Sequence, residues 1–166
     1  IIATDGAIGE MIESVELPEM KEHDIAVPLR ADCDVSEFLA WNAIEATERL
    51  GVKGIITDSK TGQTARNLAA FRGPNPVLAI CYKDKVQRWL ALSYGVISVA
   101  QHEQIGQKEQ FLAALRMLRQ KGYLSMDDKI AHLSGSFAVG GGTSFLEINK
   151  VRDVFERSGE VHLPNA

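Results

Sequence analysis

The sequence predicts an α/β domain in which a parallel sheet is covered by helices. Short apolar runs alternate with longer stretches of helical periodicity from Asp34 onward. The apolar runs contain few polar residues, as is usual for parallel strands covered on both faces. Glycines follow several of the helical stretches, where they are favoured as helix stops. Alternation of this kind implies a parallel sheet with right-handed crossovers.

The first helix of this pattern is predicted over residues 34–50. Asp34 and Glu37 have the spacing of a capping box, with a side-chain acceptor at the cap and a glutamate three residues on. Gly51 supplies the stop. The apolar positions recur at helical spacing: Leu39, Ala43, Ala46 and Leu50.

The remaining elements follow in alternation. Strands are expected at 54–57, 77–82, 96–99, 129–133 and 145–151. Helices are expected at 62–72, 84–94 and 107–121. Trp41 and Trp89 fall on apolar helical stripes, which predicts that they are core or interface anchors.

The chain divides into three regions. Residues 1–33 are predicted to form a helix over 1–17 followed by a connector that contains Pro18 and Pro28. Residues 34–155 form the α/β domain, and residues 156–166 form a C-terminal tail. Because the chain starts at Ile1 and shows no secretion signal, we expect it to be either a processed protein or, in preference, a piece of a longer one.

Charge, hydropathy and the cysteine and histidine positions argue against several classes of partner. The formal net charge is −4 and no basic stripe is present, so nucleic acid is not an expected partner. No apolar run reaches the ~20 residues of a membrane-spanning helix, so a membrane is not expected either. Two distant cysteines, Cys33 and Cys81, indicate a reducing, cytoplasmic location. The four histidines lack metal-ligand spacing, so no metal site is predicted.

The clearest candidate site is the segment that joins the first predicted strand to the next helix. It reads Thr57-Asp-Ser-Lys-Thr-Gly-Gln-Thr-Ala65. Ligands of open α/β sheets bind beyond the carboxyl ends of the strands, and a helix start offers unpaired N–H groups. The segment adds hydroxyls, one positive charge and a glycine that permits close approach. It predicts a phosphate cradle made of Ser59, Lys60, Thr61, Gly62, Gln63 and Thr64. The same residues would also serve as an ordinary helix cap.

A glycine-rich segment, residues 134–144, is the second candidate. Gly135 and Gly140 have the spacing of a P-loop, but glycines stand where its lysine and hydroxyl should be, and a strand follows instead of a helix. A loop that folds over a ligand and a plain flexible hairpin are both compatible with this segment.

Two weaker signals involve nucleophilic or acidic side chains. Asp58 ends a strand, as a phosphoacceptor aspartate would, but the usual upstream acidic pair is absent. Ser134 and Ser136 lack the GxSxG elbow of a serine nucleophile. We therefore predict no catalytic residue in this chain.

These pieces, in this order, resemble the C-terminal domain of pyruvate kinases. The resemblance extends from about Asp34 to about Val151. The matching segments are the helix 34–50, the loop Ser59-Lys-Thr-Gly-Gln-Thr-Ala65, the stretch Arg72-Gly-Pro-Asn-Pro-Val-Leu-Ala79, the stretch Leu92-Ser-Tyr-Gly-Val-Ile-Ser-Val99, the turn with Gly122-Tyr123 and Asp127-Asp128, and the loop Gly140 to Ser144. Their joint order carries more weight than any one of them.

The resemblance implies a three-layer domain with a five-stranded, mostly parallel sheet in a homo-oligomeric enzyme. It implies that residues 59–64 hold a phosphate of a phosphorylated small-molecule effector, and that Gly140, Gly141, Gly142 and Thr143 close over it. Gln63 stands where the family usually has arginine, which favours a monophosphate over a bisphosphate. The catalytic residues, with their magnesium and potassium, would lie on a separate barrel domain, so no cofactor is expected here.

Three functional hypotheses follow. The first is a regulatory and oligomerisation domain of an enzyme that transfers a phosphoryl group from phosphoenolpyruvate to ADP in glycolysis. The second is a free-standing module of the same fold that binds a phosphorylated metabolite or a flavin. The third, an independent hydrolase or transferase, is disfavoured because no nucleophile–base pair is evident.

Overall fold

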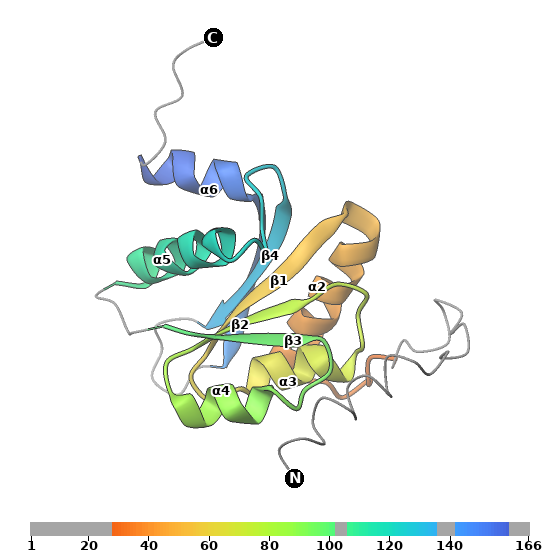
Figure 1. Cartoon of the computed structure of the whole chain (residues 1–166). Coiled ribbons are helices and arrows are strands. Elements are labelled where there is room, and N and C mark those ends of the chain that lie inside the picture. Colours follow the sequence, from red (N-terminus) through yellow and green to blue (C-terminus); the bar gives the residue numbers. More distant parts are fainter. Residues whose placement is uncertain (1–27, 102–105, 136–141, 160–166) are drawn as a thin grey trace, which may run out of the picture.

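A single mixed sheet with helices on both faces forms the domain. The computed structural model describes residues 28–101, 106–135 and 142–159. Within these residues the elements are α2 (Val35–Leu50), β1 (Val52–Ser59), α3 (Gln63–Ala70), β2 (Val77–Cys81), α4 (Asp84–Leu90), β3 (Val96–Ala100), α5 (Gln107–Gln120), β4 (Lys129–Gly135), β5 (Thr143–Lys150) and α6 (Val151–Ser158) (Figure 1). The predicted three-layer α/β fold with a five-stranded, mostly parallel sheet is confirmed.

The strands follow the order β3-β2-β1-β4-β5. β1 pairs in parallel with both β2 and β4, while β5 runs antiparallel to β4 and closes one edge of the sheet. β1 is therefore covered on every side, and its residues are buried apart from Lys53 and the partly exposed Asp58. This burial accounts for the apolar run by which the strand was predicted.

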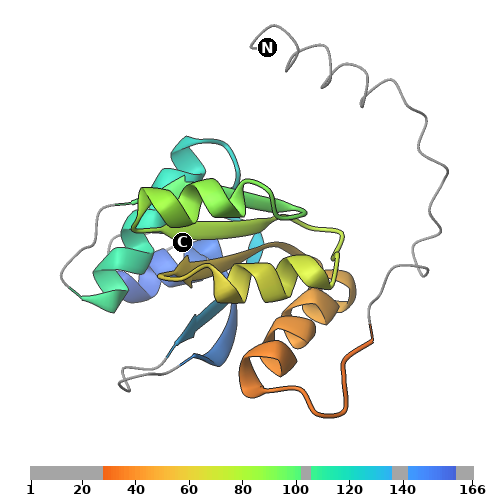
Figure 2. The same cartoon turned by 90° about the horizontal axis from the view of Figure 1, so that it is seen from below.

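Helices cover both faces of the sheet (Figures 1 and 2). A hydrophobic core lies between the sheet and each layer of helices. The core beneath α2, α3 and α4 contains Ile55, Leu68 and Leu90. The core beneath α5 and α6 contains Ile56, Leu115 and Phe155. Neighbouring residues of β1 thus enter different cores, because side chains alternate along a strand.

Helix α2 begins and ends as its sequence predicts. The carboxylate of Asp34 accepts a hydrogen bond from the backbone N–H of Glu37 at 2.8 Å. Gly51 adopts a φ of 66° after the last turn, a conformation that glycine reaches without strain. Only one half of the capping box forms, since the Glu37 side chain pairs with Arg30 at 2.7 Å.

Within the described residues, one helix was not predicted, α6. Val151, predicted as the end of a strand, is its first residue, and the strand before it begins at Thr143 instead of residue 145. Val151 and Phe155 lie one turn apart and are buried against α5 and the sheet. An eight-residue helix shows too few turns for its periodicity to stand out beside an apolar strand.

The two tryptophans differ in their surroundings. Trp41 is partly buried and packs against the α2–α4 core, as predicted. Trp89 is 58% exposed, so it is not a core residue, and its alternative assignment as an interface anchor stays a prediction. Helix α4 ends at Leu90, and its inward positions are taken by Val86 and Leu90. The Trp89 ring lies instead beside the Lys85 ammonium, 5.3 Å from ring centroid to nitrogen.

Cys81, at the end of β2, is buried, and burial raises the pKa of its thiol to about 11. It is therefore a structural thiol rather than a reactive one. Among the residues described, no helix is both long enough and apolar enough to cross a membrane.

The cap of α2 gives a test of this part of the fold. Replacing Asp34 with alanine removes the acceptor of the Glu37 N–H, and we expect the free energy of unfolding to fall by about 1 kcal/mol. Asp34→Asn retains a side-chain acceptor and should keep most of that free energy. Urea denaturation of both variants measures the difference. Equal losses in the two variants would show that the cap does not stabilise the helix.

Candidate functional site

The segment between β1 and α3 lies at the carboxyl edge of the sheet. β1 ends at Ser59 and α3 begins at Gln63, so residues 60–62 make the turn. Gly62 occupies the N-cap position with a φ of 82° and provides no side-chain cap. The first N–H groups of α3 therefore lack the usual capping acceptor, except for a long 3.4 Å contact from the Gln63 N–H to the Thr61 hydroxyl.

Two hydroxyls of β1 are buried near this edge without a hydrogen-bond partner. They are Thr57 Oγ1 and Ser59 Oγ, on residues that are 0% and 2% exposed. Both alternate with Asp58 and so share the α2–α4 face with Ile55. An unmatched buried hydroxyl costs about 1–3 kcal/mol, so a ligand atom that bonded to Ser59 would recover free energy.

The same face brings the two predicted loops together. The hydroxyls of Thr64, in the first turn of α3, and Thr143, at the start of β5, are 2.7 Å apart. Ser36 of α2 donates a longer 3.4 Å bond to the carbonyl of Thr143. Thr64 and Thr143 are separated by 79 residues in sequence, and only the fold places them side by side.

Of the three consecutive glycines in the glycine-rich segment, residues 140–142, the structure describes Gly142. Gly142 lies against α2, where an added Cβ atom would be 2.8 Å from the Ser36 hydroxyl. Gly140 and Gly141 lie outside the described residues, so the predicted closure of this loop over a ligand stays a prediction.

The charged and amide side chains of the turn take different roles. Lys60 is exposed at the turn. The Gln63 amide is engaged within α3, donating to Asn67 and accepting from Arg66, both at 2.8 Å. Arg66 is thus a cation of this segment that the sequence analysis did not single out. Its position in the first turn of the predicted helix was the available signal.

Gly62 is required for two reasons. Its φ is positive, and a Cβ atom there would lie 3.3 Å from the Leu90 side chain and 3.5 Å from that of Val86. Both residues belong to α4, which packs over the turn. A side chain at this position would strain the backbone and press on the Leu90 side chain.

A second polar cluster occupies the opposite face of the same edge. The Asp58 carboxylate accepts hydrogen bonds from the Tyr82 hydroxyl at 2.6 Å and from the Ser134 hydroxyl at 3.0 Å. The Nε2 atom of His132 lies 3.5 Å from the same carboxylate. We call these four residues the Asp58 cluster. They come from β1, β4 and the residue after β2.

The Asp58 cluster keeps its carboxyl group ionised. Burial acts to raise the pKa of Asp58, but the contacts with His132, Tyr82 and Ser134 outweigh burial and lower that pKa below its usual value. Sequence analysis noted Asp58 and Ser134 but missed His132, although a histidine inside an apolar strand was a visible signal.

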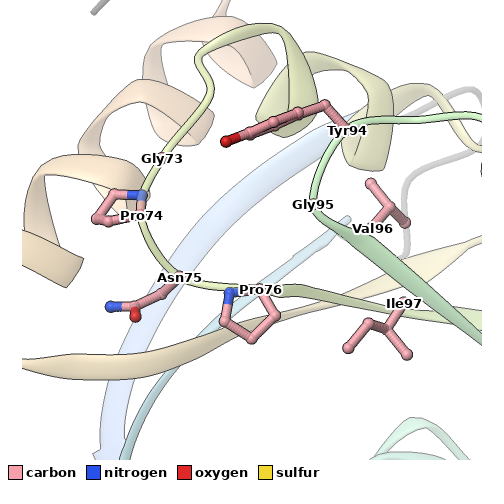
Figure 3. Close-up of a pocket in the computed structure, with 8 residues that line it drawn as sticks. All are labelled: Gly73, Pro74, Asn75, Pro76, Tyr94, Gly95, Val96 and Ile97. Atoms are coloured by element: carbon pink, nitrogen blue, oxygen red, sulfur yellow. The ribbon is translucent and has the colours of Figure 1, made fainter. Parts of the chain in front are cut away.

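A pocket of about 460 Å³ opens at the amino edge of the sheet (Figure 3). Residues 59–64 and the Asp58 cluster lie at the opposite, carboxyl edge. The pocket lies between the segments that lead into β2 and β3, and its walls include Pro76, Tyr94 and Val96. None of its eight lining residues carries a charge at neutral pH, so this pocket does not suit a phosphate group.

No group of three or more histidine, cysteine, aspartate or glutamate side chains suited to a metal ion occurs in the described part of the chain. The Asp58 cluster holds one carboxylate and one imidazole, which is fewer than the four ligands typical of a structural zinc site.

Comparison with known proteins identifies the family of this domain. A family model described as "Pyruvate kinase, alpha/beta domain" matches residues 37–149, more than half of the 166 residues. The chain belongs to this family. The predicted resemblance to the pyruvate kinase C-terminal domain is thereby confirmed.

Individual proteins that are similar in sequence to this chain are also pyruvate kinases. The chain is 35% identical over 117 residues to a pyruvate kinase of Borreliella burgdorferi, covering 69% of the chain and 24% of that enzyme. It is 24% identical over 166 residues to pyruvate kinase 2 of Synechocystis, covering 95% of the chain and 28% of that enzyme. The chain thus spans about a quarter of the length of these relatives.

A solved structure shares the fold. Cryptosporidium parvum pyruvate kinase in complex with ADP superposes with a TM-score of 0.66 at 23% identity, covering 74% of this chain and 25% of that one.

The Asp58 cluster predicts how stability of this pyruvate kinase domain depends on pH. Since the pKa of Asp58 is lowered by folding, its contribution is present above the unfolded pKa of about 3.9 and is lost as the pH falls through the folded value. We expect Asp58→Asn to lower the free energy of unfolding at neutral pH by about 1–3 kcal/mol. The variant should also lose less stability than the wild type on acidification below about pH 4.

Urea denaturation at several pH values measures both effects. Asp127→Asn is the matched control, because Asp127 pairs with Arg152 at the surface and its side chain is 78% exposed. The control should change the free energy of unfolding by less than about 1 kcal/mol. If the acid dependence of Asp58→Asn equals that of the wild type, the carboxylate does not stabilise the fold through its charge.

Proposed function

We propose that this chain is the regulatory and assembly domain of a pyruvate kinase and binds the phosphate group of a small-molecule effector at residues 59–64. The matched relatives are pyruvate kinases, and the chain spans about a quarter of their length. The parent protein would then also contain a catalytic barrel domain. That barrel would hold magnesium and potassium and transfer a phosphoryl group from phosphoenolpyruvate to ADP.

The observation that most strongly supports the proposed anion site is the buried hydroxyl of Ser59, which has no hydrogen-bond partner. It is buried where β1 ends, directly before the turn into α3. The uncapped N–H groups of α3 carry the positive end of the helix dipole. A phosphate oxygen would supply the acceptor that both the hydroxyl and the N–H groups lack.

The surrounding residues suit an anion as well. Lys60 lies on the exposed side of the turn, and Arg66 lies in the first turn of α3. Thr64 and Thr143 present a pair of hydroxyls at the rim, which could turn outward to donate to a phosphate. The glycine-rich segment 140–143 would then close the site from the β5 side.

The chemistry favours a phosphate monoester over a bisphosphate. Arginine binds phosphate with two parallel hydrogen bonds, which the Gln63 amide cannot reproduce. The Gln63 amide is also occupied by Asn67 and Arg66. A second phosphate would therefore find few further donors on this turn.

Mutagenesis with calorimetry tests the anion site. Titration of the chain with sugar monophosphates and bisphosphates should give similar affinities for the two classes. Thr64→Ala and Ser59→Ala should each weaken binding by about 1–3 kcal/mol, the range for a hydrogen bond to a charged group. Ser125→Ala, an exposed serine at the amino edge before β4, is the control and should bind as the wild type does.

Gly62→Val should abolish binding, because the backbone can no longer adopt its turn. A thermal melt of this variant separates loss of the site from loss of the fold. If Thr64→Ala and Ser59→Ala both leave a measurable phosphate affinity unchanged, residues 59–64 are a helix start and the ligand binds elsewhere.

The size of the native polypeptide tests the parent enzyme. If a barrel is joined to this domain, the intact mass should correspond to a polypeptide of about 450–500 residues. A native chain of this length alone would favour the free-standing module for a phosphorylated metabolite or a flavin. Light scattering of the native protein would test the expected homo-oligomer.

A further inference from the structure

The Asp58 cluster lies directly behind the proposed anion site. Asp58 and Ser59 are consecutive residues of β1, so the carboxylate and the unpartnered hydroxyl project from opposite faces of the same strand end. The cluster carries the charge of one ionised carboxylate within one strand thickness of the cradle. Any anion that bound at residues 59–64 would experience this charge.

We infer that the His132–Asp58 pair regulates anion binding at residues 59–64, with protonation of His132 strengthening it. This inference rests on the proposed function of that segment. An ionised Asp58 repels a phosphate or sulfate group across the strand. A proton on His132 Nε2, 3.5 Å from the carboxylate, cancels that negative charge.

The His132 ring is enclosed by aromatic side chains beside the Asp58 carboxylate. His132 is 6% exposed, and its Nε2 atom has no hydrogen-bond partner. Its ring stacks on Phe111 of α5 with centroids 3.8 Å apart and meets the edge of Phe145 at 5.7 Å. An aromatic face attracts an imidazolium, and histidine is the side chain that changes charge near neutral pH.

Helix α5 packs on the His132 ring through the uncharged Phe111, and the titratable groups with described positions around His132 come from three strand segments. Asp58 contributes its carboxylate from β1, and Tyr82 its phenol from the end of β2. Glu147 lies directly opposite His132 on β5 and is held 3.7 Å from the Arg157 guanidinium. Among the contacts described here, the carboxylate that lies against Nε2 is that of Asp58, and Glu147 is paired with Arg157.

A structural connection accompanies the electrostatic one. Asp58 holds Ser134 by a hydrogen bond, and the next residue of β4, Gly135, is paired with Thr143 of β5. Thr143 in turn contacts the Thr64 hydroxyl in the cradle. A change in the charge at Asp58 thus acts on residues that border the anion site on two strands.

The test is the pH dependence of sulfate binding to the full chain. Sulfate keeps its charge across the range, whereas a phosphate ester changes its own charge near pH 6. We follow the amide signals of residues 59–64 by NMR during sulfate titrations at about pH 6 and about pH 8. A unit charge on the far side of one strand, partly screened by salt, should make binding about fivefold to tenfold tighter at the lower pH.

Variants assign the effect to His132. His132→Phe keeps an aromatic ring between Phe111 and Phe145 but cannot take up a proton, and it should bind sulfate with nearly the same affinity at both pH values. His162→Asn removes a different histidine and should keep the full pH dependence. Saturating sulfate should also raise the pH at which the His132 ring signal titrates in the wild type, since linkage is reciprocal.

The outcomes separate the two proposals. Sulfate binding with the same pH dependence in the wild type and in His132→Phe overturns the regulatory role and leaves the anion site in place. If His132→Phe does not fold, the wild-type ring titration decides alone, and a midpoint that sulfate does not move overturns the inference. If sulfate does not perturb residues 59–64 at either pH, the anion site fails and the regulatory role fails with it.

Discussion

The parallel pairing of β1 with a neighbour on each side is the constraint on which the rest of the structure depends. β1 is bonded to β2 and β4 and is covered by helices on both faces, so its interior positions must be apolar. The carboxyl ends of the four parallel strands, β3, β2, β1 and β4, consequently meet along one edge. Apart from Lys53, which is exposed near the amino end, the polar side chains of β1 lie there, at Thr57, Asp58 and Ser59.

The alternation of a strand then divides these polar groups between two sites. Thr57 and Ser59 face the α2–α4 side, where the turn into α3 offers unpaired N–H groups. Asp58 faces the α5 side, where Tyr82 and Ser134 satisfy its carboxylate. One site therefore has donors without acceptors, and the other has a charge that is already paired. This difference explains why residues 59–64 suit an anionic ligand, whereas the Asp58 cluster suits a role in changing the affinity for that ligand.

The antiparallel strand β5 completes both sites. It returns along β4 in the opposite direction, so that its first residue, Thr143, reaches the carboxyl edge beside Thr64. The same strand places Phe145 against the His132 ring. A parallel strand in this position would bring its last residues to that edge instead. The reversal of the final strand thus joins the glycine-rich segment to the turn that follows β1.

Much of the domain could be predicted from the sequence because the physical signals were local. Buried parallel strands are apolar runs, the Asp34 cap and the Gly51 stop act over a few residues, and the turn at Gly62 needs a residue that tolerates positive φ. Helix α6 and the exposure of Trp89 could not be predicted, since both depend on what the neighbouring elements leave uncovered.

The sequence by itself determined which residues could bind an anion and that they follow a strand. Only the tertiary structure decided which groups are adjacent, because Thr64 with Thr143 and Asp58 with His132 are brought together by strand order and register across more than seventy residues of chain.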